Sequence, residues 1–146
     1  MAKRFTLAEA ENLLPSVDRL LRKAVEFKTA YAGAERRMES FQKRIIVMGG
    51  MVVDRTQIKE TRERRDDAAA SLRAVLEEVQ ELGCVVKDLD IGLVDFPTTF
   101  QGREVYLCWK LGEPAIAFWH GVDEGFAGRK AIDQDFRERH EGDPAQ

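Results

Sequence analysis

The sequence predicts an α+β protein in which a long antiparallel helical hairpin, residues 6–82, packs on a small antiparallel β-meander, residues 84–129. Two observations carry this prediction. Apolar residues recur at alternating spacings of three and four along the first segment, as they do in a helical coiled-coil seam. After Gly83 the spacing becomes two, which is typical of strands. The length of 146 residues suits one domain over residues 1–132, followed by a polar, mobile tail over residues 133–146.

The first helix has a clear start and a clear end. Thr6 and Glu9 form a capping-box pattern. Pro15 falls inside the helix and predicts a kink, and Gly49 and Gly50 predict its end. The apolar seam between these signals consists of Leu7, Ala10, Leu14, Val17, Leu21, Ala24, Tyr31, Met38 and Ile45.

The second helix begins after Asp54, a good N-cap, and ends at Gly83. Its seam consists of Ile58, Thr61, Arg65, Ala68, Leu72, Val75, Val79 and Leu82. The charged stretch KETRERRDD is predicted to be a solvated face with local ion pairs, because acids alternate with bases. Since the first helix is longer, its N-terminal turns are expected to pack on the sheet.

The turn of the hairpin has an apolar sequence, RIIVMGGMVV, over residues 44–53. Nothing else in the chain is predicted to cover it. An uncovered apolar surface favours a partner or a second copy, so we expect a homo-oligomer formed through the hairpin.

Three or four strands are predicted in the second half, in the stretches CVVKDLD, GLVDF, REVYLCWKL and PAIAFWH. In the third, Val105, Leu107 and Trp109 alternate with Tyr106, Cys108 and Lys110, so the two sets face opposite sides. Turn-forming stretches separate the runs, which favours an antiparallel meander.

Composition narrows the function classes. The formal net charge of −3 gives no support to nucleic-acid binding. No apolar run approaches the ~18 residues of a membrane span. Cys84 and Cys108 lie among apolar residues, which predicts reduced core cysteines and a cytoplasmic location.

The stretches FTLAEAENLLP, LDIGLVDFP, GREVYLCWKLGEP and FWHGVDEGFAGR together resemble a bacterial family, Domain of Unknown Function 2203. The resemblance runs from about Phe5 to Arg129. It implies a small cytoplasmic bacterial protein, and it carries no activity, substrate or catalytic residue to this chain.

One histidine stands beside several acids. His120 ends a predicted strand, Asp123 and Glu124 follow it, and Asp95 and Glu113 lie on or beside neighbouring strands. Imidazole and carboxylates are ligands of divalent transition metals, which makes these five residues a candidate metal site. The alternatives are a structural histidine hydrogen-bonded to a carboxylate, which we favour on general grounds, and a catalytic base.

Three further residues are candidate ligand contacts. Arg129, with its neighbouring glycines, suits an anion, although pairing with Asp123, Glu124 or Asp95 is the commoner role of such a residue. Trp109 and Trp119 lie on adjacent strands, where they either pack in the core or offer a stacking platform.

Three hypotheses of function follow. The leading one is a non-enzymatic interaction or self-associating module that presents a polar His/Asp/Glu/Arg site at the end of the sheet. The second is a divalent metal-binding protein or metal-dependent hydrolase centred on His120. The third is a binder of a small anionic ligand that uses Arg129. The sequence does not decide whether the protein is an enzyme.

Overall fold

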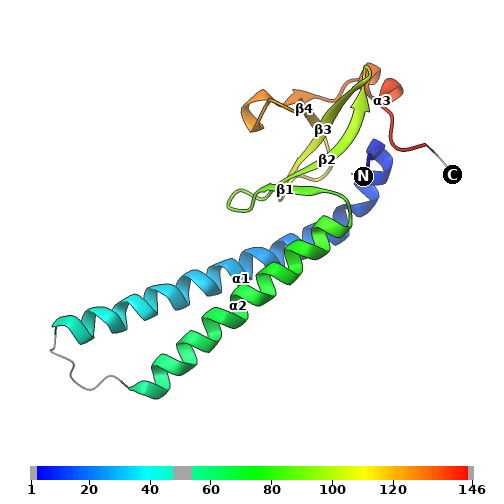
Figure 1. The fold of residues 1–146 in the computed structure, drawn as a ribbon. Coiled ribbons are helices and arrows are strands. Elements are labelled where there is room, and N and C mark those ends of the chain that lie inside the picture. The colour runs from blue at the N-terminus through cyan, green and yellow to red at the C-terminus, as the bar shows by residue number, and fades with distance from the viewer. Residues whose placement is uncertain (1–2, 48–53, 145–146) are drawn as a thin grey trace. The chain divides into compact units, whose positions relative to one another are not determined.

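The computed structural model describes residues 3–47 and 54–144 (Figure 1). The chain divides into two compact units: the sheet unit, residues 1–21 with 76–146, and the hairpin unit, residues 22–75. Two long helices, α1 (Leu7–Val47) and α2 (Arg55–Glu81), each contribute to both units. A five-stranded antiparallel sheet completes the α+β fold that the sequence predicts. Among the described residues, no helix is long and apolar enough to cross a membrane.

The first turn of α1 is closed by the predicted capping box. The Glu9 backbone N–H donates to Thr6 Oγ1 over 3.1 Å, and the Thr6 N–H donates to Glu9 Oε1 over 2.9 Å. The hydrogen bond from the Thr6 backbone lowers the pKa of Glu9. Pro15 lies inside α1 without ending it. Asp54 caps α2 as predicted, since its Oδ1 accepts from Thr56 N over 2.9 Å.

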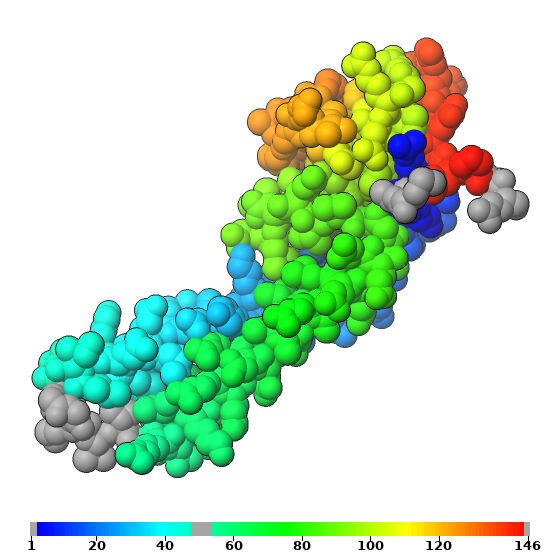
Figure 2. Space-filling model, viewed as in Figure 1, coloured from blue at the N-terminus to red at the C-terminus, as the bar shows by residue number. Residues whose placement is uncertain are grey.

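Small side chains dominate the seam of the hairpin unit. Its buried positions are Ala24, Ala34 and Phe41 on α1 and Thr61, Ala68 and Val75 on α2. The three α2 positions lie seven residues apart, as in a heptad. Figure 2 shows the side chains of α1 in cyan and those of α2 in green along this unit. Arg65, a predicted seam position, instead donates across the hairpin to Glu35 over 3.3 Å.

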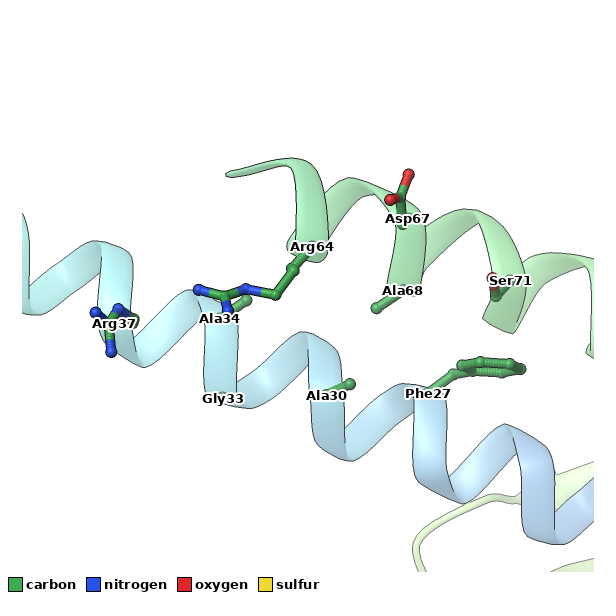
Figure 3. Close-up of a pocket in the computed structure, with 9 residues that line it drawn as sticks. All are labelled: Phe27, Ala30, Gly33, Ala34, Arg37, Arg64, Asp67, Ala68 and Ser71. Carbon is green, nitrogen blue, oxygen red and sulfur yellow. The ribbon is translucent and has the colours of Figure 1, made fainter. Parts of the chain in front are cut away.

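The small residues leave a cavity of about 470 Å³ between the two helices. Ala30, Gly33 and Ala34 line it on α1, and Ala68 and Ser71 line it on α2 (Figure 3). Such short side chains cannot fill the space between two helix backbones. In Figure 3, Arg64 extends from α2 towards α1 across this space.

The five strands follow one another in chain order across the sheet. They are β1 (Val85–Asp88), β2 (Leu93–Phe100), β3 (Arg103–Lys110), β4 (Phe118–Gly121) and β5 (Lys130–Ala131). The predicted meander is confirmed, with β5 as an additional short strand. Seven of the eight residues of β2 are buried, so β2 is the centre of the unit on both faces.

One face of the sheet packs against Phe5, two residues before α1 begins. The Phe5 and Phe96 rings meet edge to face with centroids 5.5 Å apart, and the Phe5 N–H donates to the Pro97 carbonyl over 2.7 Å. The residue that leads into the first helix therefore packs on the sheet.

The tail expected to be polar and mobile is packed on the same unit. Residues Gln134–Arg139 form α3, which Asp133 caps by accepting from Phe136 N over 2.8 Å. Phe136 is 1% exposed and stacks on Trp119 with ring centroids 5.0 Å apart. Beyond α3, Glu141 exchanges backbone hydrogen bonds with Thr99. A buried aromatic side chain and backbone hydrogen bonds thus hold a segment whose composition is otherwise that of a solvated tail.

The predicted helical seam is buried at nine of its seventeen named positions, and two of the others, Tyr31 and Ile45, are exposed. Val17, Leu21, Val75 and Val79 are buried, whereas Leu14 and Leu72 are only partly so. Of the predicted apolar turn, residues 48–53 lie outside the described residues.

Replacing Leu21 by alanine tests the seam. Leu21 is 0% exposed, so we expect the free energy of unfolding to fall by ~2–5 kcal/mol through lost apolar burial and the cavity left behind. Val25, four residues on and 37% exposed, provides the control, and Val25→Ala should change it by less than ~0.5 kcal/mol. Equal losses in urea denaturation of the two variants would contradict the assigned seam.

Candidate metal centre

Three strands bring Asp95, Cys108 and His120 together on one face of the sheet. Asp95 on β2 pairs with Cys108 on β3, and His120 on β4 pairs with Tyr106, two residues before Cys108. Because successive side chains of a strand alternate between faces, all three point to the same side. One ligand atom from each lies within 4.8 Å of the other two.

The cluster is closed to solvent. Asp95 and Cys108 are 0% exposed, and His120 is 2% exposed. His120 Nε2 lies 2.9 Å from Asp95 Oδ1, and His120 Nδ1 lies 2.8 Å from the Gly121 carbonyl oxygen. A neutral imidazole donates through one nitrogen only. Both ring nitrogens of His120 face oxygen atoms, so the two hydrogen bonds need one proton more than a neutral imidazole beside a carboxylate provides. That proton lies either on the imidazole ring or on the Asp95 carboxyl group.

The second oxygen of Asp95 is the anomaly in this cluster. Within the described residues, the buried Oδ2 has no hydrogen-bond partner. A buried polar atom without a partner costs ~1–3 kcal/mol, and more when it carries charge. One oxygen of the carboxylate thus lacks a hydrogen bond at the point where the Cys108 thiol and the His120 imidazole converge.

Burial makes the Cys108 thiol inert at neutral pH. Removal from water raises its pKa to about 12, and the negative charge of Asp95 adds to the effect. Burial likewise raises the pKa of Cys84 to about 11. A thiolate is the reactive form, so neither cysteine is an available nucleophile.

Arg129 lies beside the cluster and is engaged in a fixed ion pair. Its Nη2 donates to Glu113 Oε1 over 2.7 Å and to the Cys108 carbonyl over 3.3 Å. Its guanidinium carbon lies 4.1 Å from the ring centroid of Phe118. The predicted ligand-binding arginine therefore pairs with an acid, although a different acid from the three that the sequence suggested.

The remaining acids of the predicted site serve the surrounding turns. Glu113 Oε1 also accepts from Lys110 N over 2.7 Å. Glu124 Oε1 accepts from Lys130 Nζ over 2.6 Å, and this hydrogen bond lowers the pKa of Glu124. Asp123 is exposed. Of the four acids expected near His120, the structure brings only Asp95 into contact with it.

The glycines of the FWHGVDEGFAGR stretch make room for Glu124. A Cβ atom at Gly121 would lie 2.8 Å from Glu124 Oε1, and one at Gly128 would lie 2.9 Å from Glu124 Cβ. The Glu124 side chain thus folds back over the turn, where it also accepts from Gly121 N over 3.0 Å. This polar stretch builds the turn after β4, and only its histidine enters the cluster.

The two tryptophans have different surroundings. Trp109 is 1% exposed and donates its indole N–H to the Glu113 carbonyl over 3.0 Å, so it is a core residue. Trp119 pairs with Leu107 rather than with Trp109. It is half-buried and lines a cavity of about 700 Å³ on the sheet unit.

A family model described as an uncharacterized conserved protein, DUF2203, matches residues 3–132. The chain belongs to this family. The match spans the two long helices and all five strands, including the three that carry the cluster, and it ends before α3. No curated protein and no solved structure matches the chain. The family's description assigns no activity, so function is inferred from the site alone.

Cys108 is the site residue that the sequence prediction missed. The alternation of β3 already placed Cys108 with Tyr106 and Lys110, opposite the apolar face. The missing information was the register, which sets Asp95 opposite Cys108.

The raised thiol pKa values predict a stability that falls in alkali. An unfolded thiol ionises near pH ~8.5, whereas folded Cys84 and Cys108 hold their protons to about 11 and about 12. Rising pH therefore favours the unfolded chain, by at most ~1.4 kcal/mol per pH unit for each thiol. Urea denaturation between pH ~8 and ~10.5, with chelator and reductant, measures this slope. It should be shallower in Cys84→Ala and in Cys108→Ala, and slopes equal to that of the wild type would contradict it.

Proposed function

We propose that the protein binds a divalent transition metal ion, zinc by its donor set, through Asp95, Cys108 and His120. The observation that carries the proposal is the convergence of these three buried side chains around an unsatisfied carboxylate oxygen. Thiolate sulfur, imidazole nitrogen and carboxylate oxygen are the three donors that proteins use for zinc.

The hydrogen bonds suit this role. Nδ1 of His120 faces the Gly121 carbonyl, and an Nδ1–H donated there leaves the Nε2 lone pair directed at the cluster. Metal-binding histidines commonly use their second nitrogen in this way. The Asp95 Oδ1 to His120 Nε2 distance of 2.9 Å needs to widen by a few tenths of an ångström for both atoms to bind one tetrahedral ion at ~2.0–2.2 Å, whose fourth position these three residues leave to a water molecule.

The charges favour a divalent ion. A Cys108 thiolate and an Asp95 carboxylate carry two negative charges, and a neutral His120 adds none. A divalent cation makes the site neutral, which removes most of the cost of burying charge. It also gives the unpartnered Asp95 oxygen a positive neighbour.

The burial favours an ion that no substrate reaches over a hydrolase. All three ligands are at most 2% exposed, so a substrate has no route to them in this conformation. An ion at this place ties β2, β3 and β4 together and stabilises the fold by linkage between binding and folding.

Self-association is a second candidate function, and a separate observation favours it. Ile46 and Val47, at the end of α1, are 79% and 82% exposed. Adjacent aliphatic side chains exposed to this degree favour a contact with another protein surface. This candidate does not depend on metal binding.

Metal analysis of the purified, dialysed protein tests the metal proposal. We expect about one zinc per chain in the wild type, and loss of the ion in Cys108→Ser and in His120→Ala, because each removes a ligand. Zinc should also raise the melting temperature of the apo protein.

Cys84→Ser is the matched control, since Cys84 is the other buried cysteine and lies outside the cluster. It should retain the ion. A folded wild type that takes up no metal under reducing conditions would overturn the proposal, as would equal metal content in Cys108→Ser and Cys84→Ser.

A further inference from the structure

The two units of the chain carry opposite charge. The hairpin unit has thirteen lysines and arginines and eight aspartates and glutamates, a formal net charge of +5. The sheet unit has ten bases and eighteen acids, a net charge of −8. The whole-chain value of −3 conceals this separation. A second copy of the chain therefore offers each unit a surface of opposite sign.

The end of α1 combines exposed aliphatic and basic side chains. Ile46 and Val47 lie three and four residues after Lys43, so the three share one face of the helix, with Arg44 beside them. Lys43 and Arg44 are exposed, and no ion pair of theirs is found among the described residues. We call these four residues the α1 end patch.

The sheet unit carries a hollow of complementary character. A cavity of about 300 Å³ is lined by the apolar side chains of Leu76, Val79, Val85 and Val86. Its volume is about ten times that of a water molecule, which leaves room for an aliphatic side chain. We call this cavity the β1 hollow. Val85, on the edge strand β1, is 42% exposed, so part of its apolar lining is open to solvent.

Two exposed acidic residues of α2 are sequence neighbours of residues that line the β1 hollow. Glu77 and Glu81 lie one helical turn apart on α2 and flank Gln80, which also lines the cavity. Both are exposed, and within the described residues neither has an ion pair. The β1 hollow is thus mainly apolar with two acidic residues beside its lining residues on α2, and the α1 end patch combines apolar with basic side chains.

We infer that the α1 end patch of one copy docks in the β1 hollow of a second copy. Ile46 and Val47 supply the apolar insertion, and Lys43 and Arg44 face Glu77 and Glu81. The inference rests on the proposed self-association and names its surfaces. Acids interleaved along both helices of the hairpin unit favour this partner of mixed charge over a nucleic acid.

Each copy carries both surfaces, so the contact repeats. Two copies that exchange contacts reciprocally close into a symmetric dimer, and otherwise the contact extends to a larger assembly. The expected mass in solution is therefore that of a dimer or more.

Sedimentation of the full chain at about 100 µM tests the inference. We expect the wild type to self-associate at about 0.1 M salt and to weaken towards 1 M, where the Debye length shortens from about 10 Å to about 3 Å. Val47→Glu should weaken association at least tenfold, because it places a carboxylate in the β1 hollow. Val122→Glu is the matched control, a valine that is 53% exposed elsewhere on the sheet unit, and it should leave the mass unchanged.

Charge exchange gives the sharper readout. We expect two double variants to dissociate the protein. One combines Lys43→Glu with Arg44→Glu, which places acids opposite Glu77 and Glu81. The other combines Glu77→Lys with Glu81→Lys, which places bases opposite Lys43 and Arg44. Mixing the two double variants should restore a complex, since one carries an acidic patch and the other carries basic residues beside the lining of the β1 hollow.

Three outcomes overturn the inference, and they differ in meaning. A wild type that is monomeric at low salt removes self-association itself. Association unaffected by Val47→Glu, or double variants that do not recombine, leaves self-association standing and removes these surfaces. In the third outcome, the wild type remains monomeric and slows the gel migration of a fluorescent single-stranded RNA, and the Lys43→Glu, Arg44→Glu variant does not. This result assigns the basic residues to a nucleic acid instead.

Discussion

The register between β2, β3 and β4 is the constraint on which the rest of the site depends. Asp95 opposite Cys108, and Tyr106 opposite His120, set three chemically unlike side chains on one face. A slip of one residue along any of these strands would turn its member of the cluster to the other face. Such a slip is costly because β2 is buried on both sides, with Phe96 against Phe5 on one face and Asp95 on the other. Packing on the apolar face of the sheet thus fixes the strand register, and with it the positions of Asp95, Cys108 and His120 on the opposite face.

The energetics of the cluster are consistent with the proposed ion. A carboxylate with one unpaired oxygen, a thiol and an imidazole are all removed from water between strands. Replacing such a group by well-packed apolar side chains is often neutral or stabilising, so the fold gains little from the polar residues themselves. A bound cation changes this balance, because it pairs with the carboxylate and with a thiolate that burial alone disfavours.

Local signals predicted much of the fold. The Thr6–Glu9 capping box, the Asp54 cap and the alternation along β3 each involve contacts within a few residues, and all are present. The tail behaved differently from its composition, since its docking depends on Phe136 meeting Phe100 and Trp119 from distant strands. The spacing of apolar residues within residues 133–146 does not predict that contact.

For the candidate site too, the sequence predicted some residues correctly, and only the pairing of distant strands reveals the others. His120 and Asp95 were found from their residue types, and they lie within 2.9 Å of each other. Asp123 and Glu124 were chosen because they follow His120 in sequence, but a turn after a strand directs side chains away from its face. Cys108 was left out because a cysteine among apolar residues has the appearance of core. Only the pairing of strands distinguishes it from Cys84, which has similar burial and, within residues 3–47 and 54–144, no such cluster around it.

X-ray absorption at the zinc edge, on protein loaded with one equivalent of zinc, tests the central claim most directly. An ion held by Cys108, Asp95 and His120 predicts one sulfur at ~2.3 Å, with the remaining ligands nitrogen or oxygen at ~2.0–2.2 Å. A first shell of nitrogen and oxygen alone, with no sulfur, would show that the ion lies elsewhere and would contradict the assignment of this cluster as a metal centre.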